Sequence, residues 1–475
     1  MIATTALVVI DTTIVAIGLS DLRADFGVAG VESVVVSYLV TMGALTQIAG
    51  SLSDRIGRRR LFLAGIAVFT AASLAAAAAP SLLLLDLARA LQGVGAAVLM
   101  VNALPLLSHR YEGEARNLAI AAWGSVATAS GLIAPLLGGL LIDTFGWRAM
   151  FAVNVPIGVA ALAFGWRRLP YDTPAVHPAG VDWLGGAMLA LGLGSGTLAL
   201  LRGDEQGWTA PATALLIAIS LVALAAFLLT ERRAAAPMLE LRLFAQRAFT
   251  GALAAVFISR VLTIGGTVYF VVYFQDSLGL TASQAGLLMT PVFLAQMATG
   301  MVGAKLLSWW APGIVIASGY VLKGAAALAL AMLVAPDAPI WALIVALLVW
   351  GAGGGIAGSP VMAVAMNVTA PERAGMVAGA VTSLAAIGAG VGTAALGAIF
   401  RSRVDAQETD GTRQAVADGA SAVLFTSAAL AAVTVVLVLI LIDPRRVPRP
   451  KPDASAEAEP ARTGDRTAPA DDVRA

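Results

Sequence analysis

Long apolar stretches separated by short polar breaks follow one another along almost the whole chain. A helix needs roughly 20 apolar residues to cross a hydrocarbon core about 30 Å thick, and we place about fourteen stretches of this kind. They cover roughly residues 2–22, 33–52, 61–79, 82–107, 117–142, 148–166, 182–201, 212–230, 249–274, 283–304, 313–334, 340–366, 374–399 and 419–442. A transmembrane β-barrel would show alternating segments of about 10 residues instead. The pattern therefore predicts an all-α polytopic membrane protein.

The composition agrees with this class and excludes several kinds of site. Of the 475 residues, 59% are hydrophobic and only 12% are charged, about half the charged share of an average soluble domain. The chain has no cysteine, which excludes disulfides and thiolate ligands, and its only histidines are His109 and His177. We therefore expect no metal site, no cofactor and no enzymatic activity. We expect the protein to lie in the lipid bilayer as a monomer and to bind no nucleic acid.

Basic residues are distributed unevenly between alternate loops, which predicts the orientation. If both termini are cytoplasmic, the inner loops contain Arg55, Arg58, Arg59, Arg60, Arg110, Arg116, Arg167, Arg168, Arg232, Arg233, Arg242, Arg247 and Lys305. The outer loops then contain mainly Arg23, Arg148, Arg202, Arg401, Arg403 and Arg413. This asymmetry favours a bacterial cytoplasmic membrane protein with both termini in the cytoplasm. The first residues lack the basic segment of a cleavable signal peptide, and we expect the natural N-terminus to lie upstream.

A weak internal repeat divides the chain into two halves. A shift of about 250 residues places Gly50 on Gly303 and brings QGVGAA (92–97) near WGAGGG (350–355). These similar segments predict two six-helix bundles related by a parallel repeat, as in transporters whose two halves move against each other around a central site. The expected divisions are a first bundle over 1–166, a two-helix insertion with cytoplasmic linkers over 167–247, a second bundle over 248–442 and a disordered cytoplasmic tail over 443–475.

Asp11 lies inside the first apolar stretch, flanked by Thr12 and Thr13. A carboxylate at bilayer depth is costly when ionised, so burial favours its protonated form and allows exchange of a proton near neutral pH. Asp11 is therefore our first candidate for a proton or cation site. The alternative is a carboxylate that an arginine neutralises permanently for the stability of the bundle.

Arg89 lies in the fourth stretch and shares one helical face with Asp86, Gly93, Ala96 and Met100. A buried arginine keeps its charge and needs a carboxylate partner. Asp86, three residues earlier, and Asp11, across the bundle, are the two options. If Asp11 shares Arg89, protonation of Asp11 would release the arginine. The alternative is that Asp86 and Arg89 simply pair with each other near the outer surface.

Two glycine-containing stretches are candidates for moving parts. In GSLSDRIGRRRLFL (50–63), Gly50 would allow close helix approach, Gly57 a tight turn, and Asp54 contacts with arginines or with a helix N-terminus. The candidate latch comprises Gly50, Asp54, Arg55, Gly57, Arg58 and Arg59. The alternative is that these arginines only anchor the topology.

In the fifth stretch, Pro135 would kink the helix, and glycines at 131, 138 and 139 would let another helix approach. The alternative is an ordinary membrane helix, in which glycine and proline are also common.

These stretches resemble known signatures. GSLSDRIGRRRLFL resembles the cytoplasmic loop signature of the major facilitator superfamily, and VIDTTIVAIGLSDL (9–22) the first-helix signature of its fourteen-helix drug/proton antiporters. ARALQGVGAAVLM (88–100) is similar to the fourth-helix signature and APLLGGLLIDTFGWRAMFAVNVPIG (134–158) to the antiporter signature, although Ala134 stands where Gly usually precedes the proline. The resemblance implies that the latch holds the outward-open state, that Arg89 takes part in proton coupling, and that Gly131, Pro135, Gly138 and Gly139 form the hinge of exporters.

The second half contributes two deep cations, Arg260 and Lys323, with no equally deep carboxylate nearby in the sequence. Their cost at membrane depth argues for a cavity or a partner. The candidates to line a wide apolar cavity for the substrate are Thr12, Arg260, Tyr269, Tyr273 and Lys323. The alternative for the tyrosines is an aromatic belt at the membrane interface.

The sequence thus predicts a proton-coupled exporter of lipophilic drugs or antibiotics that works by alternating access. No phosphate-binding loop of the form G-x-x-x-x-G-K-[ST] is present, so the expected drive is the proton gradient. The alternative is an exporter of one endogenous metabolite or self-made antibiotic, and Arg260 and Lys323 would suit an anionic one. A membrane-embedded enzyme or a transporter-like receptor would be a third class.

Overall fold

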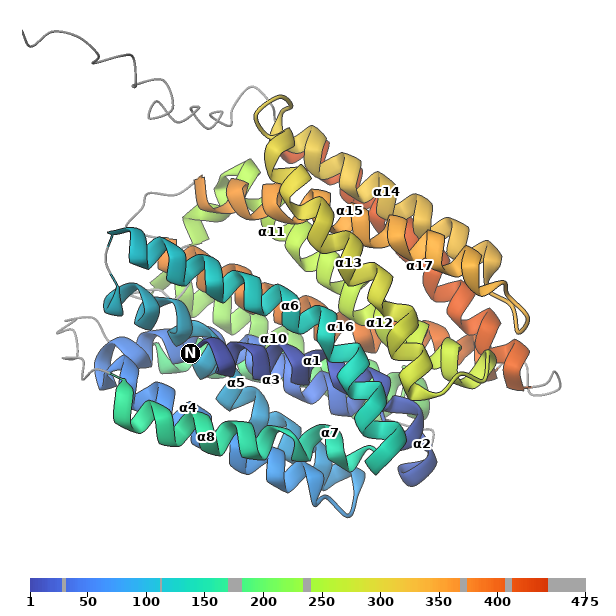
Figure 1. Ribbon diagram of the computed structural model, residues 1–475, viewed down its shortest axis with the longest axis horizontal. Helices are drawn as coiled ribbons and strands as arrows, with labels where there is room; N and C mark the ends of the chain where they lie inside the picture. The colour runs from blue at the N-terminus through green and yellow to red at the C-terminus, as the bar shows by residue number, and fades with distance from the viewer. Residues whose placement is uncertain are drawn as a thin grey trace, which may run out of the picture.

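The computed structural model describes residues 1–27, 31–111, 113–169, 182–233, 241–367, 374–405 and 412–442, and every regular element in these ranges is helical (Figure 1). The elements of the first half are α1 (Ile2–Ile17), α2 (Leu19–Phe26), α3 (Ser33–Ile56), α4 (Arg58–Ala77), α5 (Leu82–Arg110), α6 (Gly113–Phe145), α7 (Arg148–Ala152) and α8 (Asn154–Arg168). An intermediate pair follows, α9 (Trp183–Gln206) and α10 (Pro211–Arg233). The remaining elements are η1 (Leu241–Ala245), α11 (Arg247–Arg260), η2 (Val261–Gly265), α12 (Gly266–Val272), η3 (Tyr273–Ser277), α13 (Ala282–Leu306), α14 (Pro312–Leu333), α15 (Ile340–Asn367), α16 (Ala374–Asp405) and α17 (Thr412–Leu441).

Thirteen of the described helices are long and apolar enough to cross a membrane, and the bent pair of α1 and α2 makes up to fourteen. The predicted all-α polytopic class is therefore confirmed. One expected span, 2–22, is not a single straight helix, because the chain bends by 59° between α1 and α2. Another, 249–274, is interrupted by two π-helical turns, η2 and η3.

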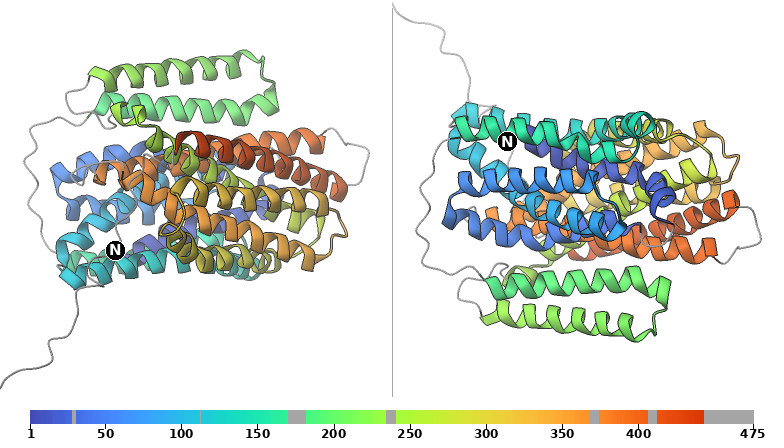
Figure 2. Two further views of the ribbon diagram at one scale, coloured as in Figure 1. Left: turned by 90° about the horizontal axis from the view of Figure 1, so that it is seen from above. Right: turned by 90° about the horizontal axis from the view of Figure 1, so that it is seen from below.

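Helix contacts follow the predicted arrangement of two bundles and an inserted pair. In the first half α3 and α4 pack on α5, and α1 on α6. In the second half α13 and α14 pack on α15, and α14 also on α17. The inserted pair, α9 and α10, lies to one side of the other helices (Figure 2), where α9 contacts α3 and α16. The predicted boundaries at 166, 247 and 442 stay a prediction.

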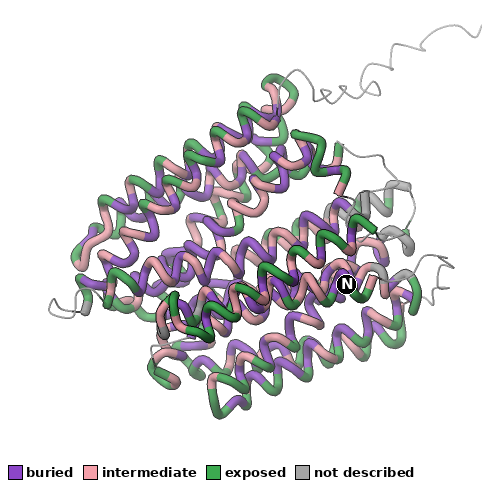
Figure 3. Tube along the Cα trace, turned by 180° about the vertical axis from the view of Figure 1, so that it is seen from behind, coloured by how far each residue is buried: buried purple, intermediate pink, exposed green. Residues whose placement is uncertain are grey.

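The helix α10 indicates which surfaces face lipid. Only 22% of Pro211–Arg233 is buried, although this is one of the most apolar segments. Exposed positions recur along the outside of the helices (Figure 3). In α10 they include Leu215, Leu221 and Val222. An apolar face of this extent is typical of a helix whose solvent is the bilayer.

Helix ends are set by local chemistry. Thr281 begins α13 with a capping box, in which its hydroxyl accepts from the Gln284 N–H while the Gln284 side chain accepts from the Thr281 N–H. Gly57 ends α3 with φ of 99°, a conformation that favours glycine. The turn predicted at Gly57 is thus present.

The contact of α6 with α13 is closest at one end of the molecule, which we call the α2 end because α2 lies there, and the turn between α3 and α4 lies at the opposite end (Figure 1). The halves are also joined by α3 and α16, where Ser383 donates to the Gly43 oxygen. Along α6 and α13 the contact weakens away from the α2 end. A Cβ on Gly286 would lie 2.2 Å from the Pro135 oxygen, and one on Gly139 would lie 2.5 Å from a backbone oxygen of α13. A Cβ on Gly131 would have its nearest atom 3.6 Å away, and a Cβ on Gly124 would have no atom within 4 Å. The two helices therefore diverge toward the opposite end.

Charged contacts also join the halves at the α2 end. Glu32 is fully buried and pairs with Arg23 of its own half at 2.8 Å and with Arg401 of α16 at 3.0 Å. Arg23 also reaches Asp276 of the second half at 3.3 Å. Asp143, near the end of α6, accepts the first backbone N–H groups of α13 at 3.1 and 3.0 Å and so caps a helix of the other half.

Replacing Glu32 by Gln should loosen the α2 end. The change leaves Arg23 and Arg401 without their shared anion, and loss of one partner of a buried charge pair costs about 2–5 kcal/mol. Because the chain has no cysteine, spin labels can be placed on Ala24→Cys in α2 and Gln414→Cys in α17, both exposed. We expect the distribution of label distances to shift to longer values.

The matched control is Asp25→Asn, because Asp25 pairs with Arg148 at 3.1 Å within the first half. This variant should leave the distances as they are. Equal distances in wild type and Glu32→Gln would show that the buried carboxylate does not hold the halves together.

Candidate functional site

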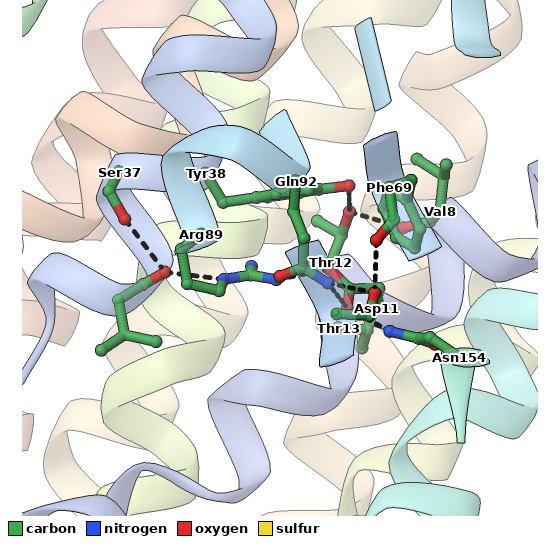
Figure 4. A network of polar contacts seen from close by, with 12 residues as sticks. Val8, Asp11, Thr12, Thr13, Ser37, Tyr38, Phe69, Arg89, Gln92 and Asn154 are labelled. Atoms are coloured by element: carbon green, nitrogen blue, oxygen red, sulfur yellow. Dashed lines mark hydrogen bonds and ion pairs between the residues drawn. The ribbon is translucent and has the colours of Figure 1, made fainter. Parts of the chain in front are cut away.

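A buried ion pair inside the first half joins Asp11 of α1 to Arg89 of α5 (Figure 4). Their side chains are 0% and 1% exposed, and Arg89 Nη1 lies 2.6 Å from Asp11 Oδ2. Of the two partners that the sequence left open for Arg89, the structure brings Asp11 to it. Both charges lie in apolar helices, so each compensates the other where water is excluded.

Two amides complete the surroundings of the Asp11 carboxylate. Asn154 at the start of α8 donates to Asp11 Oδ1 at 2.7 Å, and Gln92 of α5 donates to the same oxygen at 3.3 Å. Gln92 also accepts from Arg89 at 2.8 Å and contacts Ser73 of α4 at 2.7 Å. The carboxylate thus faces three donors, an arrangement that suits its anionic form because an ionised carboxylate only accepts hydrogen bonds.

Arg89 is fixed on its other sides by α3 and α7. Its Nε donates to the Val34 oxygen at 3.0 Å, and its guanidinium carbon lies 4.1 Å from the centre of the Tyr38 ring and 5.6 Å from that of Phe151. Such cation–π contacts stabilise a desolvated guanidinium. The Tyr38 hydroxyl lies 3.3 Å from Thr12 Oγ1, so Thr12 joins the edge of this network.

Asp86 lies on the same helix as Arg89 but does not pair with it in the described structure. Its Oδ2 accepts from the Ser33 hydroxyl at 2.6 Å, while Arg89 extends toward α1. The alternative of a local Asp86–Arg89 pair is therefore wrong for this conformation. The reason is that Asp11 offers Arg89 a fully buried partner, whereas Asp86 is only partly buried.

The stretch 50–63 has a different geometry from the one expected. A Cβ on Gly50 would meet only Val101, at the ordinary distance of 3.4 Å, so the close helix approach predicted there is wrong. Close approach occurs instead at Gly93, where a Cβ would lie 2.6 Å from a backbone oxygen of α3. Arg59 is buried and donates to the Trp166 oxygen at 2.7 Å. The side chain of Asp54 lies outside the described residues.

The glycine stretch of α6 faces two neighbours. Gly138 lies against α1, where a Cβ would be 2.5 Å from Ile14 Cγ1, and Gly139 lies against α13. The helix continues through Pro135 from Gly113 to Phe145. This segment of α6 is therefore held between α1 of its own half and α13 of the other.

In the second half, Tyr269 and Tyr273 do not line an open surface. They are 1% and 0% exposed, and their hydroxyls donate to the Thr393 and Ala335 oxygens at 2.7 Å. The predicted cavity role is wrong for this conformation, because both rings belong to the packed core. Lys323 is also buried, whereas Arg260 is exposed.

The profile of the Major Facilitator Superfamily matches residues 1–393. The chain belongs to the major facilitator superfamily. Among curated relatives of this transporter chain, the methylenomycin A resistance protein of Streptomyces coelicolor is 31% identical over 377 residues, covering 78% of each chain. The multidrug efflux pump LfrA of Mycolicibacterium smegmatis is 34% identical, covering 84% of this chain and 80% of its own.

Solved structures support the superfamily fold. A POT family peptide transporter in an autoinhibited state has a TM-score of 0.67 at 17% identity, covering 94% of this chain and 96% of its own. At that identity the likeness concerns the fold alone. The predicted family is confirmed, and so is the predicted architecture.

The sequence did not predict the two uncharged residues of the site, Gln92 and Asn154. Gln92 stands three residues after Arg89, on the same helical face, and this spacing could have identified it. Asn154 contacts Asp11 across 143 positions of the chain, and no local pattern signals that contact.

Replacing Asp11 by Asn should destabilise the protein by about 3–5 kcal/mol, because Arg89 would remain charged and buried without its anion. Replacing both, as Asp11→Asn with Arg89→Gln, should recover much of this loss. Thermal unfolding of the protein in detergent measures the coupling. If the double variant loses the sum of the two single losses, the ion pair makes no joint contribution to stability.

Proposed function

We propose that the chain is a proton-coupled exporter of lipophilic drugs or antibiotics that works by alternating access. The single observation that carries the proposal is the buried Asp11–Arg89 pair in a superfamily fold, since an ionisable pair in a membrane bundle is costly and marks functional sites. The relatives, among them a multidrug efflux pump and an antibiotic resistance protein, support the substrate class.

We infer that both termini lie in the cytoplasm of a bacterial cell, as the loop charges favour. The α2 end then faces outward and the Gly57 end inward. In that orientation we infer an inward-facing conformation, because Glu32 and Asp143 join the halves at the α2 end and α6 and α13 diverge toward the other.

In the proposed cycle Asp11 carries the proton. A proton on Asp11 removes the charge that holds Arg89 and turns one oxygen from acceptor to donor. Arg89 then loses its anion and its contact weakens, which changes the packing of α1 against α5. Asp86 lies between Arg89 and the α2 end of α5, and we propose that it relays protons between the outer side and Asp11.

We further propose that the stretch Gly50–Arg59 acts as an inner latch, in which Asp54, Arg55 and Arg58 stabilise the outward-open state. Gly57 supplies its turn and Arg59 fixes α4 to α8. The glycines of α6 and Pro135 would be the hinge, since they lie where α6 contacts α13. The protein is proposed to act as a monomer without a cofactor.

The direct test is transport into proteoliposomes of several unrelated lipophilic dyes, driven by an imposed pH gradient. Wild type should move the dyes against their gradient, and Asp11→Asn should fall to the level of protein-free vesicles, because its amide does not titrate.

The matched control is Asp337→Asn, since Asp337 is exposed in the loop between α14 and α15. This variant should transport like wild type. Unchanged gradient-driven transport by Asp11→Asn would remove Asp11 from the mechanism.

The second candidate is an exporter of a single endogenous compound, and the two cations of the second half favour it. Expression in a pump-deficient host distinguishes the two. Resistance to several unrelated compounds favours the multidrug exporter, and resistance to one compound favours the dedicated exporter.

A further inference from the structure

Lys323 in α14 is a buried cation without a compensating charge. Its side chain is 2% exposed, and its only hydrogen bond within the described structure goes to Thr263 Oγ1 at 2.7 Å. Its Nζ lies 5.5 Å from the centre of the Trp350 ring. An ammonium has three donors, so this environment leaves it short of acceptors. In the described residues no carboxylate forms an ion pair with Lys323.

A second cation lies close to the first. Arg260 ends α11, three residues before Thr263, and the Thr263 hydroxyl is the group that Lys323 contacts. Arg260 is exposed, and across the described ranges it too has no acidic partner. Two neighbouring charges of the same sign repel each other, and at membrane depth they are costly without an anion. The repulsion between the two cations and the lack of an acidic partner both favour binding of an anion at this site.

The backbone of α15 lies close to the end of the Lys323 side chain. A Cβ on Gly354 of α15 would lie 3.2 Å from Lys323 Cε, 3.6 Å from its Nζ and 3.7 Å from Gln296 Cδ. The neighbouring Gly353 and Gly355 lie against other helices, where a Cβ would come within 2.4 and 2.1 Å of other atoms. At Gly354 the nearest atoms belong instead to the ends of the Lys323 and Gln296 side chains. A side chain at position 354 would therefore press on the end of Lys323.

The helix that carries Arg260 and Thr263 is irregular at this point. The π-helical turn η2, Val261–Gly265, follows Arg260 directly. Single π-helical turns inside α-helices often occur at functional sites. Here the turn carries Thr263, whose hydroxyl reaches Lys323 on α14.

We propose that this cluster of the second half, Arg260, Thr263, Lys323 and Gly354, binds the carboxylate of a lipophilic organic anion, the class of cargo that the protein exports. Lys323 binds one carboxylate oxygen, and Arg260 approaches the other from the exposed side. The apolar part of the cargo lies toward Trp350 and Phe270, whose rings pack edge to face at 5.7 Å. The proposal rests on the exporter function and assigns its substrate class.

The probes are 1-pyrenebutyrate, a lipophilic carboxylate, and its methyl ester, which has the same ring system without the charge. Binding to purified protein in detergent is followed by pyrene fluorescence anisotropy. The acid should bind wild type roughly tenfold or more tightly than the ester, because charge-assisted hydrogen bonds are made only by the acid. Lys323→Met and Arg260→Met should each raise the Kd of the acid roughly tenfold and leave that of the ester unchanged.

Two further variants separate binding from folding. Lys305→Met removes an exposed lysine of the same half and should bind the acid like wild type. Gly354→Val removes no charge, but its side chain would press on the end of Lys323 and displace Nζ, so it should weaken binding of the acid more than binding of the ester. Equal affinity of acid and ester for wild type, or an unchanged Kd of the acid in Lys323→Met and Gly354→Val, would overturn the proposal.

The test is independent of proton coupling, since no gradient is present in detergent. Transport of neutral dyes by a protein that binds acid and ester alike would refute the anion site and keep the exporter. Selective binding of the acid without any gradient-driven flux would refute the exporter instead.

Discussion

A buried ion pair between a carboxylate and a guanidinium constrains how the helices of the first half are arranged. Asp11 and Arg89 lie on different helices, and their contact at 2.6 Å with almost no exposure requires α1 and α5 to be held in fixed register. Gln92 and Asn154 bring further donors from α5 and α8 to the same carboxylate. The arrangement is stable only while Asp11 is ionised, because a protonated carboxyl no longer balances Arg89. A change of one proton therefore alters the balance of forces at the centre of the bundle.

The helix α1 connects this site to the contact between the halves. Three residues after Asp11, Ile14 packs on Gly138 of α6, and the Ile17 oxygen accepts from Gln275 of the second half at 2.8 Å. Movement of α1 would thus reach the α2 end, where the halves are joined. The two halves also differ in charge: the first contains a compensated pair, whereas the second contains Arg260 and Lys323 without an acidic partner in the described structure. This asymmetry is the basis for the proposed proton site in the first half and the proposed anion site in the second.

The sequence predicted the class, the spans and the Asp11–Arg89 pair as one of two options, because charges are conspicuous inside apolar stretches. It did not predict the amides around Asp11 or the cap that Asp143 provides to α13, since a neutral Asn and an acidic residue near a helix end look ordinary and their partners are 143 and 139 positions away. The tyrosines of α12 and η3 were misplaced for a related reason. A helix that is apolar all round gives no periodic signal to distinguish the core from a cavity or from lipid.

The central claim is that Asp11 exchanges a proton against cargo, and the most direct measurement is proton movement driven by the cargo itself. In proteoliposomes with no membrane potential and no initial pH difference, an outward gradient of a transported compound should drive protons inward, and a trapped pH indicator should report acidification. Asp11→Asn should give no acidification. Downhill movement of the compound through wild type with no change in internal pH would contradict the account.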